Sequence, residues 1–170
     1  MTESRVLVVY GSTNGSTAEI ARWIGETLSG EGIAVDVSSV DAVGDLAPYT
    51  AVVLGSAAYE RRWLRDVVRF AHHHRGALVK VPVWLFSSGP LDASASERDI
   101  PPVSRAVKVA EELHVRGHMT FGGRLVDGAQ GRIARMMLDQ GKGGDFRDPG
   151  QIRGWALGIA AELASLPQPS

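Results

Sequence analysis

The chain of 170 residues, with a mass of 18.1 kDa, is long enough for one domain with a hydrophobic core and too short for two ordinary ones. Hydrophobic residues make up 44% and charged residues 22%, a balance typical of globular proteins and not of disordered ones. Cysteine is absent, which excludes disulfides, thiolate nucleophiles and cysteine-ligated zinc or iron–sulfur clusters. We expect a single domain over residues 1–165 and a short C-terminal tail over residues 166–170.

The net charge of −1 argues against nucleic-acid binding, which usually requires a basic excess. The charge is unevenly distributed along the chain. Residues 1–60 carry eight acidic and two basic side chains, whereas residues 61–170 carry eleven acidic and sixteen basic ones. No apolar run approaches the ~18 residues needed to cross a bilayer, and the N-terminus lacks the layout of a signal peptide. These features predict a cytoplasmic protein that binds no nucleic acid and has at most peripheral membrane contact.

Apolar runs that end in glycine or polar residues predict five strands, in chain order near residues 6–10, 33–37, 51–55, 81–86 and 118–125. Apolar residues at helical spacing lie between and after them, and predict helices near residues 20–28, 64–71, 103–110 and 152–163. A helix over residues 41–46 would be short at best, and residues 127–148 remain as an additional segment. Strands that alternate with helices imply right-handed crossovers, and therefore a parallel sheet with helices on both faces.

The loop between the first predicted strand and the first predicted helix carries the most informative polar chemistry. A helix N-terminus at this place offers unpaired N–H groups and the positive end of the helix dipole. Four hydroxyls and one amide join them, and several neutral donors suit the exposed oxygens of a phosphate monoester. The Gly-x-Gly-x-x-Gly pattern of pyrophosphate sites and the Gly-Lys-Ser/Thr ending of nucleoside-triphosphate loops are absent. The loop therefore predicts a monophosphate site on Ser12, Thr13, Asn14, Gly15, Ser16 and Thr17.

An interpretation without a ligand stays open for the same loop. Ser16 and Glu19 have the Ser-x-x-Glu spacing of a capping box, in which the two side chains satisfy backbone amides of the helix start.

The run from Tyr10 to Thr17, followed by Glu19, Ile20 and Ala21, resembles the FMN-phosphate loop of flavodoxins. Flavodoxins more often have threonine and asparagine where this chain has Asn14 and Ser16, and both replacements can still form hydrogen bonds. The rest of the chain, including residues 144–148, looks like the flavodoxin-type, menaquinone-dependent protoporphyrinogen dehydrogenase branch. The resemblance implies a doubly wound five-stranded parallel sheet in the order 2-1-3-4-5, with FMN at the loops of its edge.

By the same resemblance, two further segments would hold the flavin ring. They are Ser56, Ala57, Ala58 and Tyr59 after the third strand, and Ser87, Ser88, Gly89, Pro90 and Leu91 after the fourth. Tyr59 is the expected stacking partner, because aromatic stacking contributes ~0.5–1.5 kcal/mol beyond burial. Alternatively, Tyr59 is a strand-end aromatic that packs on a helix. Trp63 is a second candidate for stacking on the flavin, and a role in packing alone is equally expected for it.

Arginines after the third strand favour an enzyme over an electron carrier, because carriers typically have an acidic face around the flavin. Arginine forks match the propionates of a porphyrinogen, so the substrate-binding candidates are Arg61, Arg62, Arg132 and Arg135. Alternatively, Arg61, Arg62, Arg65 and Arg69 form a solvated helix face. The resemblance implies a quinone as electron acceptor. Residues 136–138 would touch a membrane surface or form the buried face of a short helix.

Three hypotheses remain: an FMN-dependent oxidoreductase, which we favour, a flavodoxin-type electron carrier, and a cofactor-free binding module. No general base is evident, so no catalytic residue is assigned. His72, His73 and His74 do not predict a metal site, because neighbours on a helix point about 100° apart. A phosphoacceptor receiver domain is excluded, because Gly55 and Ser56 stand where its aspartate is needed. His114 and His118 flank a predicted turn and are expected at the surface.

Overall fold

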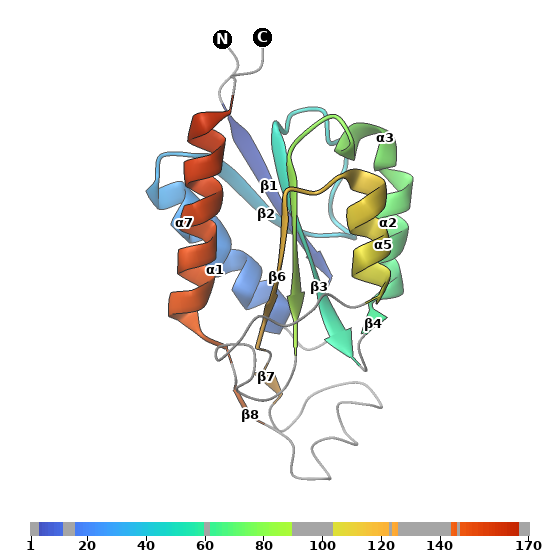
Figure 1. Cartoon of the computed structure of the whole chain (residues 1–170), viewed down its shortest axis with the longest axis vertical. Coiled ribbons are helices and arrows are strands. Elements are labelled where there is room, and N and C mark those ends of the chain that lie inside the picture. The colour runs from blue at the N-terminus through green and yellow to red at the C-terminus, as the bar shows by residue number, and fades with distance from the viewer. Residues whose placement is uncertain are drawn as a thin grey trace.

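Residues 4–11, 16–59, 62–89, 104–122, 124–125, 144–145 and 147–166 are described in the computed structural model of the chain. Five strands form a parallel sheet in the spatial order β2-β1-β3-β5-β6 (Figure 1). They are β1 (Arg5–Gly11), β2 (Ala34–Ser39), β3 (Ala51–Tyr59), β5 (Val83–Ser88) and β6 (Gly117–Phe121). The two-residue β4 (Arg62–Trp63) pairs antiparallel with the end of β3. Counting the long strands alone, the predicted order 2-1-3-4-5 is confirmed.

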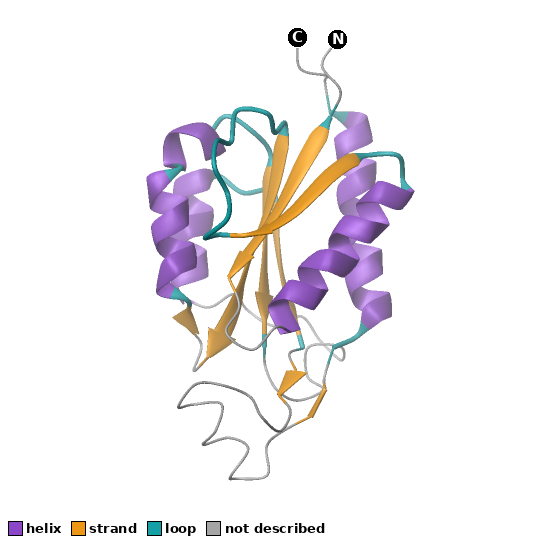
Figure 2. Ribbon diagram, turned by 180° about the vertical axis from the view of Figure 1, so that it is seen from behind, coloured by secondary structure: helices purple, strands orange, loops and turns teal. Residues whose placement is uncertain are grey.

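Helices cover both faces of the sheet, as the alternating pattern predicts. Figures 1 and 2 show α1 (Ser16–Gly30) and α7 (Pro149–Ser165) on one face, and α2 (Arg65–His73), α3 (Arg75–Leu78) and α5 (Ser104–Leu113) on the other. A separate antiparallel pair is formed by β7 (Arg124–Leu125) and β8 (Gly144–Asp145). All five long strands run in one direction, so their carboxyl ends share one edge, which lies opposite the two chain termini in Figure 1.

The core consists of two apolar layers, one on each side of the sheet. Leu7 and Val9 of β1 belong to the layer beneath α2 and α5, and Val6 and Val8 belong to the layer beneath α1 and α7. Because both faces of the central strands β1, β3 and β5 are buried, these strands are continuous apolar runs rather than alternating ones. This double burial is why these three strands were predictable from the sequence, whereas no residue of the edge strand β2 is buried.

The structure differs from the sequence prediction at three places. β3 continues to Tyr59, so residues 56–59 are not a loop: β5 pairs with them as far as Ala57, and β4 pairs with the last two. Ser87 and Ser88 likewise lie inside β5 and not after it. Residues 41–46 form no helix; they are a turn and an irregular stretch that ends at the buried Leu46.

Two glycines allow close packing near the carboxyl edge. A Cβ on Gly11 would stand 2.3 Å from a methyl group of Val67 in α2, and a Cβ on Gly55 would stand 2.0 Å from the ring of Phe86. Gly11 therefore lets α2 approach the end of β1, the point from which the chain turns toward α1.

Candidate functional site

The start of α1 presents a buried hydroxyl that lacks a hydrogen-bond partner. Thr17 lies in the first turn of α1 and is 0% exposed, and its Oγ1 has no partner among the described residues. An unsatisfied buried donor costs about 1–3 kcal/mol, so such groups usually have a partner in the functional state. An anion at this helix N-terminus would accept from Thr17 and from backbone N–H groups of the first turn. Ser12, Thr13, Asn14 and Gly15 lie outside the described residues, as does the side chain of Ser16.

An arginine from a distant part of the sequence contacts the same helix turn. Arg147 forms an ion pair with Glu19, and its guanidinium lies 4.8 Å from the centre of the Trp23 ring. The Arg147 side chain is only 6% exposed. The carboxylate of Glu19 thus has an arginine partner, while the capping-box interpretation of Ser16 and Glu19 stays open. The sequence offered no signal for this pair, because its members are 128 positions apart.

The carboxyl ends of β3 and β5 are tied together by side-chain hydrogen bonds. Ser56 Oγ donates to the carbonyl oxygen of Ala57 at 2.8 Å and accepts from the backbone N–H of Leu64 at 3.0 Å. Trp63 Nε1 donates to Ser87 Oγ at 2.7 Å. Both serine hydroxyls therefore hold the β3–β4 hairpin in place. Whether the backbone at these positions also contacts a flavin ring stays a prediction.

The prediction that His118 is a surface residue is wrong. His118 lies in β6, half-buried, with Nε2 3.0 Å from Ser87 Oγ. Burial lowers the pKa of its imidazole to about 4, so the ring is neutral near pH 7. The strand itself was predicted near residues 118–125, but the neighbouring turn suggested an exposed side chain, although alternation of His118 with the buried Thr120 was a readable sign of a half-buried strand. His114, by contrast, is exposed, with a φ of 52°.

Three buried hydroxyl residues form a row across neighbouring strands. Ser56 is the register partner of Ser87, and Ser87 is the register partner of Thr120. Thr120 is 4% exposed, and in the described part of the chain its Oγ1 has no hydrogen-bond partner. The row lies on the sheet face covered by α2 and α5, near the carboxyl ends of the strands. Sequence analysis identified two of these serines but not Thr120.

The hairpin of β3 and β4 brings two predicted site residues together. Tyr59 is the register partner of Arg62, and Ala58 is the register partner of Trp63. Trp63 is 2% exposed, so the packing interpretation of this residue is confirmed. The side chains of Ala58, Tyr59 and Arg62 lie outside the described residues, as do Arg61, Pro90, Leu91, Arg132 and Arg135 altogether.

Gly89 closes the end of β5. Its φ is +133°, a conformation that favours glycine, and its N–H donates to the carbonyl oxygen of Phe121 at 2.7 Å. This contact joins the predicted ring-binding segment to β6.

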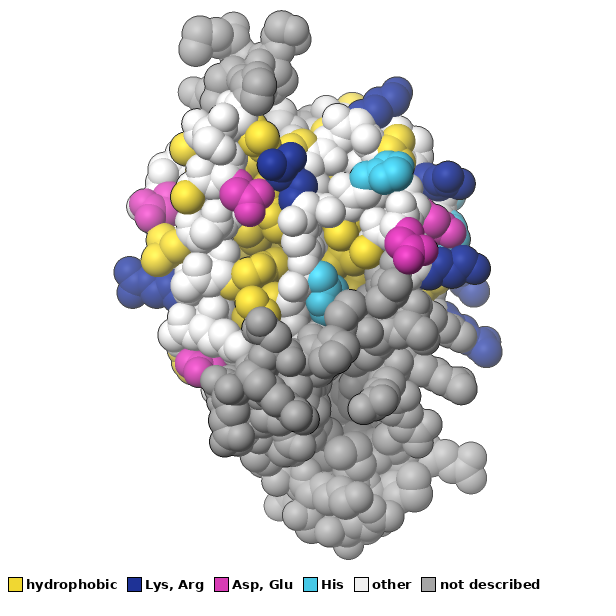
Figure 3. All heavy atoms as spheres, in the orientation of Figure 1, with side chains coloured by type: hydrophobic (Ala, Val, Ile, Leu, Met, Phe, Trp, Pro, Cys, Tyr) yellow, Lys and Arg dark blue, Asp and Glu magenta, His cyan; other side chains and the backbone are white. Residues whose placement is uncertain are grey.

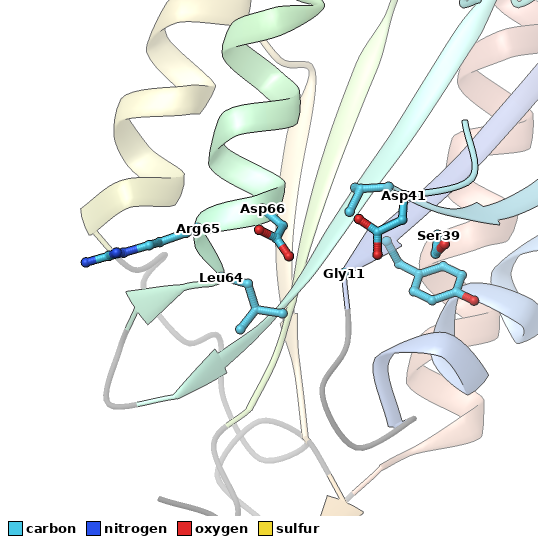
Figure 4. Close-up of a pocket in the computed structure, with 8 residues that line it drawn as sticks. Gly11, Ser39, Asp41, Leu64, Arg65 and Asp66 are labelled. Carbon is cyan, nitrogen blue, oxygen red and sulfur yellow. The ribbon is translucent and has the colours of Figure 1, made fainter. Parts of the chain in front are cut away.

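A cleft of about 260 Å³ lies beside the end of β1, on the α2 side of the sheet (Figure 4). Ser39 and Asp41 line it from the end of β2 and the turn that follows, and Leu64 and Asp66 line it from the start of α2. Figure 4 shows the carboxylates of Asp41 and Asp66 directed into the cleft, while Arg65 points away from it. Two carboxylates disfavour an anion, so a phosphate fits the start of α1 and not this cleft.

Basic side chains gather on the side of the molecule formed by α2, α3 and α5, as Figure 3 shows. The basic side chains described in these helices are Arg65, Arg69, Arg75 and Lys108, all exposed. For Arg65 and Arg69, this exposure agrees with the interpretation of a solvated helix face. No helix in the described ranges is long and apolar enough to span a membrane.

The three consecutive histidines have separate neighbours. His72 Nδ1 is 3.4 Å from Glu112 Oε2 on α5, while the rings of His73 and His74 are in edge contact and that of His74 also contacts Phe70.

A doubly wound parallel sheet whose first strand leads to a helix start at the carboxyl edge is the architecture of mononucleotide-binding α/β domains. A family model described as "Flavodoxin domain" matches residues 7–140, and the chain belongs to this family. The cofactor of the family is FMN, and the hydroxyl of Thr17 at the start of α1 fits its phosphate. FMN is therefore the cofactor of this protein.

Solved structures support the same fold. The chain is 16% identical to a rubredoxin:oxygen oxidoreductase from Desulfovibrio gigas, with a TM-score of 0.65, over 96% of this chain and 37% of that one. This chain thus spans little more than a third of that enzyme. It is 15% identical to an archaeal flavodoxin (TM-score 0.64) over 94% of this chain and 99% of that one. A cysteine-to-serine variant of a flavodoxin from Pseudomonas aeruginosa is 16% identical (TM-score 0.60), with coverage of 94% and 99%. No curated protein matches the chain significantly.

Proposed function

We propose that this protein is an FMN-dependent oxidoreductase that performs two-electron chemistry on a small organic substrate, such as protoporphyrinogen or a quinone. The observation that carries this proposal is the pairing of Tyr59 with Arg62 in the β3–β4 hairpin. It brings an arginine next to the residue expected to stack on the flavin. A guanidinium there would stabilise the negative charge that two-electron reduction places on the ring.

The described residues at the ends of β3 and β5 support the same choice. Ser56, Ala57, Ser87, Ser88 and Gly89 are all uncharged, so these strand ends supply none of the negative charge typical of a carrier. FMN, when bound, supplies the hydride acceptor, and the protein supplies binding, orientation and electrostatics.

A porphyrinogen substrate suits the basic residues of the chain. Its propionates would pair with Arg61, Arg62, Arg132 and Arg135, whose guanidinium groups can form paired hydrogen bonds with carboxylates. A quinone would take the electrons. We place the reaction in the cytoplasm, in line with the expectation from the sequence.

An electron-carrier function is the second candidate, and the acidic cleft favours it. Asp41 and Asp66 present two carboxylates beside the end of β1, where a basic redox protein could dock. If the protein is an electron carrier, Arg62 would bind no substrate.

The test is anaerobic turnover of the FMN-loaded protein with protoporphyrinogen and a quinone. We expect oxidation of the porphyrinogen, and a large loss of kcat/KM in Arg62→Ala. Arg69→Ala is the matched control, because Arg69 is exposed one helix turn beyond Arg65 and should leave turnover unchanged. Absence of turnover, with a one-electron-reduced flavin dominating a redox titration, would establish the carrier function instead.

A further inference from the structure

The ion pair between Arg147 and Glu19 addresses an electrostatic problem at the cofactor site. Glu19 is the acidic residue in the first turn of α1, the helix to whose N-terminus we assign the FMN phosphate. A carboxylate favours a helix N-terminus, but it also repels a phosphate dianion bound there. The Arg147 guanidinium lies against this carboxylate and neutralises it.

Burial makes the neutralisation effective. The Arg147 side chain is 6% exposed and that of Glu19 is 35% exposed, so water screens this half-buried pair less than it would screen a pair with both members at the surface. The indole of Trp23, one turn further along α1, also contacts the guanidinium, by a cation–π contact at 4.8 Å. Arg147 therefore contacts two successive turns of the helix that binds the phosphate.

The backbone around Arg147 is anchored as well. The next residue, Asp148, caps α7 by accepting from the N–H of Gln151 at 3.1 Å, and Pro149 opens that helix. The helices α1 and α7 run side by side on one face of the sheet (Figure 1). A fixed helix end thus directs Arg147 toward the start of α1.

We propose that Arg147, by neutralising Glu19, makes the site selective for phosphorylated flavin and so discriminates FMN from riboflavin. Arg147 is a positioning residue: its charge acts on the phosphate through Glu19 and through the first turn of α1. The inference rests on the assignment of FMN to this helix start, and it holds whether the protein is an enzyme or a carrier.

The experiment compares the dissociation constants of FMN and riboflavin in the wild type and two variants, by quenching of flavin fluorescence. In Arg147→Met the Glu19 carboxylate loses this arginine and repels the phosphate of FMN. The preference for FMN over riboflavin should therefore fall on the order of tenfold, while the affinity for riboflavin changes little. In the double variant with Glu19→Gln the preference should return to within a few-fold of the wild type. Competition by inorganic phosphate, which needs no ring site, should weaken and recover in parallel.

Arg116→Met is the matched control. It breaks a different arginine–glutamate pair, between Arg116 Nε and Glu162 Oε2 of α7 at 3.1 Å, which is exposed. It should leave the preference unchanged. Equal weakening of FMN and riboflavin in Arg147→Met would show a structural role and overturn the proposal, as would failure of Glu19→Gln to restore the preference. Lack of porphyrinogen turnover would contradict the proposed function alone, because these affinities do not depend on it.

Discussion

The indole N–H of Trp63 donates a 2.7 Å hydrogen bond to the hydroxyl of Ser87, and both side chains are buried near the carboxyl edge of the sheet. In the described part of the chain the two-residue β4 pairs with β3, and this side-chain bond connects it to β5 as well. The same hydroxyl contacts His118, which extends the connection to β6. One serine thereby fixes three strands whose ends border the predicted ring site.

Loss of the Ser87 hydroxyl should lower the free energy of unfolding, although only one oxygen atom is removed. Ser87→Ala leaves the indole N–H of Trp63 buried without an acceptor, and the expected loss is about 1–3 kcal/mol of unfolding free energy. Trp63→Phe removes the donor instead and keeps most of the apolar packing. Urea denaturation of the apoprotein measures both changes. A loss below about 0.5 kcal/mol in Ser87→Ala would show that the bond contributes nothing net.

His118 should make the fold less stable in acid. The pKa of its imidazole is about 4 in the folded state and about 6.5 in the unfolded state. Between these values the unfolded chain binds an extra proton, so stability is full above pH 6.5 and declines as the pH falls toward 4. The loss from this residue is on the order of 3 kcal/mol at pH 4.

The His118 contribution is isolated by comparison with His118→Asn, which cannot titrate but can still bond to Ser87. Denaturation curves at several pH values should show a shallower decline from pH 6.5 to 4 in the variant. Parallel curves for the two proteins would contradict the buried, neutral state of the imidazole.

Two glycine-to-alanine changes should have opposite effects. Gly55→Ala places a methyl group 2.0 Å from the ring of Phe86 in a buried strand, and it should destabilise the protein by about 1–3 kcal/mol. Gly154→Ala meets nothing within 4 Å on the exposed side of α7, and it should stabilise the protein by about 0.5–1 kcal/mol. Thermal unfolding of the two variants measures both signs. A neutral Gly55→Ala would mean that Phe86 can move aside.

The fold was predictable because its signals are local, whereas the site depends on contacts between distant residues. Buried apolar runs gave the strands, and the periodicity of α7 was readable within one helix. The pairing of Arg147 with Glu19, and the chain from Trp63 to His118, join elements that only the folded sheet brings together. A two-residue strand such as β4 carries no periodicity at all, which is why the extension of β3 to Tyr59 was missed.

Thr17 offers the most direct test of the phosphate site, because its hydroxyl should act oppositely on folding and on binding. Thr17→Val keeps the shape and removes a buried hydroxyl that has no partner in the described part of the chain, so the apoprotein should be as stable as the wild type or more stable. FMN affinity should fall about tenfold or more, because a hydrogen bond to a charged phosphate contributes about 1.5–3 kcal/mol.

Thr17→Ser and Thr120→Val complete this test. Serine restores the hydroxyl and should restore most of the FMN affinity. Thr120→Val removes a second buried hydroxyl, in β6, that lacks a partner among the described residues. This change should raise the stability of the apoprotein and leave the preference for FMN over riboflavin unchanged. If Thr17→Val bound FMN like the wild type, the phosphate would have to lie away from the first turn of α1. If it bound FMN and riboflavin with equal losses, the hydroxyl would support the site without touching the phosphate.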